Sequence, residues 1–282
     1  MNLNTIFDNM SKILQITDIH INGEYNGQFD VRGHFEQILE ANKAHEFDAI
    51  ALTGDLADNG TVDDYWYIFD RITDTFGGNT PILAIPGNHD NRENLDIAYM
   101  DYINDGHDFK EGADLQRIGG TFEEPGKCVV ILTLSDAKLV GMDNAHKDLP
   151  HQGLRTFIDH EWEHRQSNIY RLFTHMPLIK PFHRFMNADA HSIDEDAAKT
   201  FLWALREFDF RGIFCGHYHC ASVAVFDDFA QYAAPASQCQ LDPFAKECSP
   251  SGNYPGYAII CPGMHERHMC KFHYITEVEN GN

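Results

Sequence analysis

Short apolar runs alternate with longer amphipathic stretches through the first two thirds of the chain. Apolar runs of about four to eight residues between turn-forming residues are typical of buried strands, whereas apolar residues about three or four positions apart predict a helix. The expected strands are 12–17, 48–53, 81–86, 128–134, 138–143, 169–174 and 211–215, and the expected helices are 31–45, 62–75, 91–103, 154–164 and 196–207.

This alternation of strands and helices predicts a mainly parallel sheet covered on both faces. The runs at 128–134 and 138–143 are too close together for an intervening helix and predict a hairpin. After Gly216 the runs are short and β-like, so we expect them to form a second, largely antiparallel sheet packed on the first. The expected fold is of the α/β class, a four-layer α/β/β/α sandwich of two mixed sheets flanked by helices. We expect a single domain over residues 1–282, with 236–282 as a C-terminal β-rich extension.

Potential metal ligands follow five of the predicted strands. Open α/β sheets place ligand sites at the carboxyl ends of their strands, and the ends of one parallel sheet converge in space. Any one such residue is more often structural, but their joint occurrence predicts a metal site. Carboxylate, amide and imidazole groups suit Mn, Fe, Zn or Co, and the lack of thiolates argues against a purely structural zinc. The polar residues at these strand ends are Asp18, His20, Asp55, Asp58, Asn88, His89, Asp90, His175, His217 and His219.

These residues belong to short motifs that resemble, in order and spacing, the five motifs of the calcineurin-like metallophosphoesterases. The motifs are Asp18-Ile19-His20, GDLAD at 54–58, GNHD at 87–90, His175 and GHYH at 216–219. The resemblance covers roughly residues 13–235 and implies a metallo-dependent phosphatase-like fold with two divalent or trivalent metal ions. Two metals can clamp the attacking and leaving oxygens of a phosphate ester and activate a water molecule as the nucleophile.

The resemblance also implies a role for each residue of the site. Asp18, His20 and His219 are implied to bind one metal, Asn88, His175 and His217 the other, and Asp55 both. His89 is implied to contact the phosphoryl group and protonate the leaving oxygen, with Asp90 as the acidic partner that orients it. Asn59, Arg92 and His183 are candidate substrate contacts. His183 lies in the stretch 177–192, for which an ordinary surface loop is slightly favoured over a lid facing the substrate.

Within the superfamily, the chain is most similar to the class III cyclic-nucleotide phosphodiesterases and their glycerophosphodiesterase relatives. The segment APASQCQLDPF and the run PGYAII at 255–260 carry this similarity, although the branch's His-His-Pro reads His175-Met176-Pro177 here. The implied function is hydrolysis of small phosphodiesters, with 3′,5′-cyclic nucleotides as candidates. A phosphomonoesterase or nucleotidase is the alternative, followed by a non-catalytic scaffold, which would usually have lost ligand residues, and by a nuclease.

The net charge of the chain limits the kinds of molecule that it is expected to bind. The chain has 43 acidic and 21 basic residues, a formal net charge of −22, and such a surface repels nucleic acid. A small phosphate ester is still expected to bind, because metal ions make the site locally positive. No apolar run approaches the roughly 18 residues that span a bilayer, and the N-terminus has no signal-peptide pattern, so we expect a cytoplasmic protein without membrane contact. Strands after residue 220 are candidates for pairing in a homo-oligomer.

Overall fold

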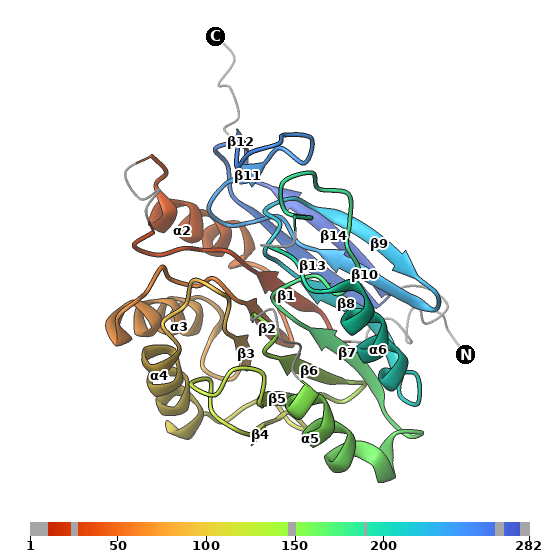
Figure 1. The fold of residues 1–282 in the computed structure, drawn as a ribbon. Helices are drawn as coiled ribbons and strands as arrows, with labels where there is room; N and C mark the ends of the chain where they lie inside the picture. Colours follow the sequence, from red (N-terminus) through yellow and green to blue (C-terminus); the bar gives the residue numbers. More distant parts are fainter. Residues whose placement is uncertain (1–10, 24–27, 146–150, 189–190, 263–267, 277–282) are drawn as a thin grey trace, which may run out of the picture.

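The computed structural model describes residues 11–23, 28–145, 151–188, 191–262 and 268–276. Within these residues, two mixed sheets pack face to face with helices on their outer sides, which confirms the predicted fold class (Figure 1). One sheet has the order β14 (His268–Tyr274), β13 (Gly256–Pro262), β1 (Ile13–Ile16), β2 (Ala49–Thr53) and β3 (Ile82–Ile85). The other has the order β4 (Asp114–Gly119), β5 (Cys128–Thr133), β6 (Lys138–Met142), β7 (Ile169–Phe173), β8 (Asp209–Cys215), β10 (Phe229–Ala233) and β9 (Ser222–Phe226). A short pair, β11 (Gln240–Leu241) and β12 (Pro250–Gly252), lies apart from both.

The helices divide between the two outer faces (Figure 1). The first sheet is covered by α2 (Val31–Asn42), α3 (Val62–Phe76) and α4 (Arg92–Asn104). The second is covered by α5 (His151–Glu161), which a 3-10 turn at Trp162–His164 extends, and by α6 (Glu195–Leu205). A polar residue caps most of these helices, as where Thr61 and Asp64 form a capping box at the start of α3. No helix of the described chain is both long and apolar enough to cross a bilayer.

Side chains alternate between two buried layers along the strands of the second sheet. Val130 and Leu132 of β5 belong to the buried cluster that includes β1, β2 and β3, whereas Val129 and Ile131 belong to the cluster under α5 and α6. This period of two places one face of the strand against the other sheet and the other face against helices. The sheets are in close contact, since a Cβ atom added to Gly141 would lie 2.7 Å from the Ile85 Cγ2 atom.

Apart from the short pair β11 and β12, the described strands after Gly216 join the two main sheets and do not form the expected second sheet, so that prediction is wrong. β9 and β10 extend the seven-stranded sheet, whereas β13 pairs antiparallel with β1 and covers its edge, Ile13 opposite Ile260. The partner of a strand is set by contacts far apart in sequence, which an apolar pattern does not specify. The pattern also missed β4, which pairs with β5 but is mostly exposed and has few apolar residues. The strands that precede the predicted ligands also divide between the two sheets, since β1, β2 and β3 belong to the first sheet and β7 and β8 to the second.

Candidate metal centre

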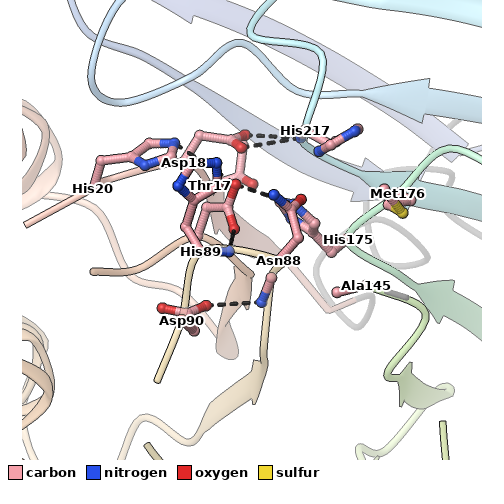
Figure 2. Close-up of polar contacts among 12 residues, drawn as sticks. Thr17, Asp18, His20, Asn88, His89, Asp90, Ala145, His175, Met176 and His217 are labelled. Carbon is pink, nitrogen blue, oxygen red and sulfur yellow. Dashed lines mark hydrogen bonds and ion pairs between the residues drawn. The ribbon is translucent and has the colours of Figure 1, made fainter. Parts of the chain in front are cut away.

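The predicted metal ligands lie together where the carboxyl ends of strands from both sheets meet (Figure 2). Five of them border a cavity of about 220 Å³, namely His20, Asp55, Asn88, His217 and His219. Backbone hydrogen bonds hold the loops that carry them: the Asp18 amide donates to the Gly54 carbonyl, and the Gly216 amide to the His175 carbonyl, each at 3.0 Å. A further bond joins the two sheets, because the His217 amide donates to the Asp18 carboxylate at 3.0 Å. The site is therefore built across the contact between the sheets.

The first group of ligands consists of Asp18, His20 and His219, whose ligand atoms all lie within 4.8 Å of one another. The Nε2 atoms of His20 and His219 are 3.2 Å apart, and the Nε2 atom of His219 is 3.5 Å from a carboxylate oxygen of Asp18. Two imidazole nitrogens and a carboxylate that point at one place, all buried, form a donor set that suits a divalent cation.

The second group consists of Asp55, His175 and His217, with Asn88 beside it. The Nε2 atom of His175 lies 3.2 Å from the Asp55 Oδ2 atom and 3.1 Å from the Asn88 Oδ1 atom. The same Asp55 oxygen is 3.7 Å from the Nε2 atom of His20 in the first group. Asp55 therefore stands between the two groups, which together have the arrangement of a binuclear metal site.

Each histidine of the two groups is held by a hydrogen bond from the ring nitrogen that faces away from the other ligands. The bonds run from His20 Nδ1 to the Asp58 carboxylate (2.5 Å), from His175 Nδ1 to the Thr53 carbonyl (2.8 Å), from His217 Nε2 to the His191 carbonyl (2.8 Å) and from His219 Nδ1 to the Cys239 carbonyl (3.2 Å). Because a carbonyl oxygen only accepts, the bonded nitrogen carries the hydrogen and leaves the other for a metal ion.

Charge within the site supports the same assignment. Burial lowers the pKa of His217 and of His219 to about 3, so both rings are neutral, as metal binding requires. Burial alone would also lower the pKa of His175 and raise that of Asp55, but their mutual attraction outweighs it. The pKa of His175 rises to about 9 and that of Asp55 falls well below its usual range. Without metal, a proton on His175 thus balances the buried Asp55 carboxylate, and a cation would take its place.

The backbone of the site is strained. Asp18, His20, Asp55, His217 and His219 have φ angles of 52°, 54°, 50°, 68° and 48°, a left-handed conformation that is uncommon outside glycine. Such conformations cost about 1–3 kcal/mol each and persist at functional sites because the surroundings hold them. Gly54 has a φ of 85°, and a Cβ atom on Gly87 would lie 2.1 Å from the Asp55 Oδ1 atom. The two glycines therefore allow the turn before Asp55 and the close approach of the next loop.

The acidic partner of His89 is Asp58 and not Asp90, which corrects the expectation from sequence. The Nδ1 atom of His89 lies 3.2 Å from the Asp58 oxygen that also bonds to His20, and this contact raises the pKa of His89 to about 9. Burial would raise the pKa of Asp58, but its bonds to His20 and His89 hold it below the usual range. Asp58 is the second Asp of the GDLAD motif. The sequence therefore contained this residue in a motif, but a role was predicted only for the first Asp, Asp55.

Asp90 instead fixes the backbone of the loops that carry Asp55 and Asn88 (Figure 2). Its carboxylate accepts hydrogen bonds from the amides of Leu56, Ala57 and Gly87 and from the Tyr65 hydroxyl, at 2.7 to 3.2 Å. Burial, with the nearby Asp55 charge, raises the pKa of Asp90 to about 6. The side chain of Asp90 therefore points into the protein, while that of its neighbour His89 is half-exposed at the cavity.

None of the three predicted substrate contacts lines the cavity. Asn59 is exposed at the rim, where its amide donates to the His89 carbonyl at 2.9 Å. The guanidinium of Arg92 is bound by both oxygens of Asp143, at 2.6 and 3.0 Å. His183 is buried, and its Nδ1 atom accepts a hydrogen bond from the Met186 amide. A contact between Arg92 or His183 and substrate is thus not supported, because both side chains are engaged inside the protein.

The loop at 177–192 nevertheless reaches the cavity, so the preference for an ordinary surface loop was wrong. Phe185, Met186 and His191 line the cavity. Other parts of the wall are Phe29, Gln238, Cys239, Leu241, Cys248 and Pro250, none of which was among the predicted site residues. Gln238, Cys239 and Leu241 belong to the segment APASQCQLDPF, which carried the similarity to the cyclic-nucleotide phosphodiesterase branch without a role for single residues.

We expect metal to stabilise this protein. The protein is first treated with EDTA. Mn²⁺ added at a concentration about a hundredfold above its dissociation constant should then raise the Tm by about 5–10 °C. The reason is that the buried carboxylates and imidazoles are brought together only in the folded chain, so the cation binds the folded state in preference to the unfolded one. Differential scanning calorimetry would measure the shift, and Asp55→Ala should reduce it. An equal shift in Asp55→Ala, or none in the unaltered protein, would contradict the assignment of these residues as ligands.

The chain is similar in sequence and fold to several known proteins. Residues 11–221 match the calcineurin-like phosphoesterase family. A probable cyclic nucleotide phosphodiesterase of Fibrobacter succinogenes is 28% identical over 234 residues, which cover 82% of each chain. A probable glycerophosphodiester phosphodiesterase of Arcobacter nitrofigilis is 25% identical and covers 82% of this chain and 80% of its own. The fold is similar to that of a dimetal phosphatase from Danio rerio, with a TM-score of 0.58, 10% identity and coverage of 93% and 95% of the two chains. The match covers most of the chain, including all five motifs, and the chain therefore belongs to the calcineurin-like phosphoesterase family.

Proposed function

We propose that this protein is a binuclear metal-dependent phosphodiesterase that hydrolyses small diesters, with 3′,5′-cyclic nucleotides as the leading class. The observation that carries the proposal is the pair of ligand groups joined by Asp55 at one wall of a small cavity. The printed functions of the two bacterial relatives, one for cyclic nucleotides and one for glycerophosphodiesters, support a diester substrate.

The charge of the cavity also favours a diester over a monoester. Among the described residues that line it, none is a lysine or an arginine. A monoester dianion or a polyphosphate carries more negative charge than a diester does, next to Asp18, Asp55 and Asp58. A diester has a single negative charge, and its second substituent can be neutral. The described lining offers no lysine or arginine, only the protonated His89, for the extra charge of a monoester.

The residues present fit two metal ions. Asp18, His20 and His219 would hold one ion, Asn88, His175 and His217 the other, and Asp55 would be shared. We propose Mn, Fe, Zn or Co as the metals, because carboxylate, amide and imidazole donors suit all four. When bound, such ions activate water and neutralise the phosphoryl oxygens.

His89 would act as the proton donor. Its Nδ1 atom is occupied by Asp58, its side chain is 49% exposed at the cavity, and its pKa is raised to about 9. The ring is therefore protonated at neutral pH, with its Nε2–H free to donate to the leaving oxygen. Asp58 keeps the ring charged and fixes its orientation, so that one carboxylate serves both His89 and the metal ligand His20.

A comparison of ester classes would test the proposal. The Mn²⁺-loaded protein should hydrolyse bis(4-nitrophenyl) phosphate with a kcat/KM at least about tenfold above that for 4-nitrophenyl phosphate, the equivalent of about 1.4 kcal/mol in the transition state. Release of 4-nitrophenolate measures both rates. The reverse preference would identify a phosphomonoesterase or nucleotidase, and inactivity toward both esters with each of the four metals would refute the proposal.

A further inference from the structure

A buried glutamine lies below the candidate metal centre, in β1. Gln15 is fully buried, and its neighbours in the strand, Leu14 and Ile16, are apolar and fully buried as well. A polar side chain at such a position costs free energy unless its groups find hydrogen-bond partners. The partners of Gln15 therefore indicate what this side chain does.

The carboxamide of Gln15 joins strands of both sheets. Its Nε2 atom donates to the Thr53 hydroxyl at 3.0 Å and to the Cys215 carbonyl at 3.1 Å. Thr53 is the last residue of β2 and Cys215 the last residue of β8, so these two bonds connect the first sheet with the second. Because a carbonyl oxygen only accepts, the atom of Gln15 that faces Cys215 must be the nitrogen.

Each of the three strands joined in this way leads into predicted metal ligands. These are Asp18 after β1, Asp55 after β2, and His217 and His219 after β8. Thr53 adds a further connection, since its carbonyl accepts the hydrogen bond from the Nδ1 atom of His175 at 2.8 Å. Gln15 is thus connected, directly or through Thr53, to the backbone that carries ligands of both groups.

The oxygen of the same carboxamide is left without a partner. The Oε1 atom of Gln15 is buried and accepts no hydrogen bond from any described residue. A methionine would fill similar space without leaving an unsatisfied acceptor, and each such buried group calls for an explanation. The two bonds of the Nε2 atom are what an apolar residue at this position would not supply.

We propose that Gln15 is a positioning residue that sets the spacing of the two ligand groups. Its two bonds hold the end of β2 against the end of β8. The second ligand group needs this contact, because Asp55 follows a strand of the first sheet whereas His175 and His217 follow strands of the second. This inference rests on the proposed function and extends it from the ligands to the side chain that holds their strands together.

Gln15→Met tests the inference, since it keeps the length of the side chain and removes both bonds. At saturating Mn²⁺, kcat toward bis(4-nitrophenyl) phosphate should fall by about tenfold, at the low end of the effect of outer partners of metal ligands. KM should change by less than about twofold. The spin coupling between two bound Mn²⁺ ions, measured by electron paramagnetic resonance, should change as well. A residue that only stabilised the fold would lower the Tm and leave both quantities as they are.

Gln240→Met is the matched control. Gln240 is also buried, its Nε2 atom also donates to two acceptors, the carbonyls of Ala236 and Tyr254 at 2.8 and 3.2 Å, and its Oε1 atom also lacks a partner in the described part of the chain. These bonds do not reach the ends of β2 or β8, so this variant should keep the kcat and the spin coupling of the unaltered protein. Equal changes in the two variants, or an unchanged kcat and coupling in Gln15→Met, would overturn the inference.

A second variant makes the test independent of the folding of Gln15→Met. Thr53→Val removes one acceptor of the Gln15 Nε2 atom and keeps the backbone carbonyl that binds His175. It should change kcat and spin coupling in the same direction as Gln15→Met and by a smaller amount. A Thr53→Val protein with the kcat and coupling of the unaltered protein would count against the inference.

The spectroscopic measurement separates this inference from the proposed function. If the unaltered protein binds two Mn²⁺ ions but hydrolyses no phosphate ester, the proposed function fails, whereas the spin coupling still reports on Gln15. A change of coupling in Gln15→Met that Gln240→Met does not show would then support the positioning role. The same coupling in all three proteins would overturn it.

Discussion

Asp55→Ala should lower kcat toward bis(4-nitrophenyl) phosphate by at least about 10³-fold, because the charge stabilisation supplied by the metals is worth several kcal/mol. Asp55 reaches both ligand groups, with its Oδ2 atom 3.2 Å from His175 and 3.7 Å from His20. Its other oxygen accepts a hydrogen bond from the His89 amide at 2.8 Å. Loss of this one side chain would therefore weaken two metal positions and release the loop that carries the proton donor.

Steady-state rates and the metal content per chain should be measured together for this variant. Asp159→Ala, at an exposed position of α5, is the matched control and should keep the activity and the metal content of the unaltered protein. We expect Asp55→Ala to bind less than two metal ions per chain. An Asp55→Ala protein with more than about a tenth of the original kcat would rule out a bridging role.

His89→Ala should lower kcat by about 10²–10⁴-fold, the range for loss of general acid–base catalysis. The loss should depend on the leaving group, since a basic leaving oxygen needs a proton more than 4-nitrophenolate does. Methyl phenyl phosphate and methyl 4-nitrophenyl phosphate differ by one nitro group, which makes the leaving oxygen of the second ester less basic, so the loss should be larger for the phenyl ester. Equal losses for the two esters would show that His89 contributes binding and not proton transfer.

The variants Asp58→Asn and Asp90→Asn then distinguish the roles of the two acidic residues near His89. Asp58 contacts the imidazole, so Asp58→Asn should reproduce part of the leaving-group dependence, with a loss of about 10–100-fold. Asp90 binds backbone amides and a tyrosine hydroxyl instead, and Asp90→Asn should lower the free energy of unfolding by about 1–3 kcal/mol without that dependence. The opposite pattern would restore Asp90 as the partner of His89.

Local features of this chain were readable from its sequence. The helix expected at 62–75 is found at Val62–Phe76, and the strand expected at 169–174 at Ile169–Phe173. In α3 the period of apolar positions matches the buried face, whereas β7 is a short run buried on both faces. The residues of the five motifs could be selected for the same reason, since each directly follows a buried strand.

Features that depend on contacts between distant segments were not readable. The pairing of β13 with β1 joins residues more than 240 positions apart, and the bond from His34 to Gln238 spans 204 positions. Asp90 follows His89 directly in sequence, yet the turn of the chain points the two side chains in different directions, so adjacency suggested the wrong partner. Phe29, Phe185 and Met186 line the cavity but belong to none of the five motifs, so the fold alone reveals their place beside the site.

The position of the ligand groups on two separate sheets has a consequence for motion in the protein. Ions bound there would tie one edge of the sandwich, so local separation of the two sheets at that edge would speed their release. The exchange rate of bound metal, followed with a radioactive isotope, should then rise when the two sheets separate more often. Substitutions between the sheets, as at Phe173 and Phe214 with ring centroids 5.2 Å apart, would change metal residence time while every ligand stays in place.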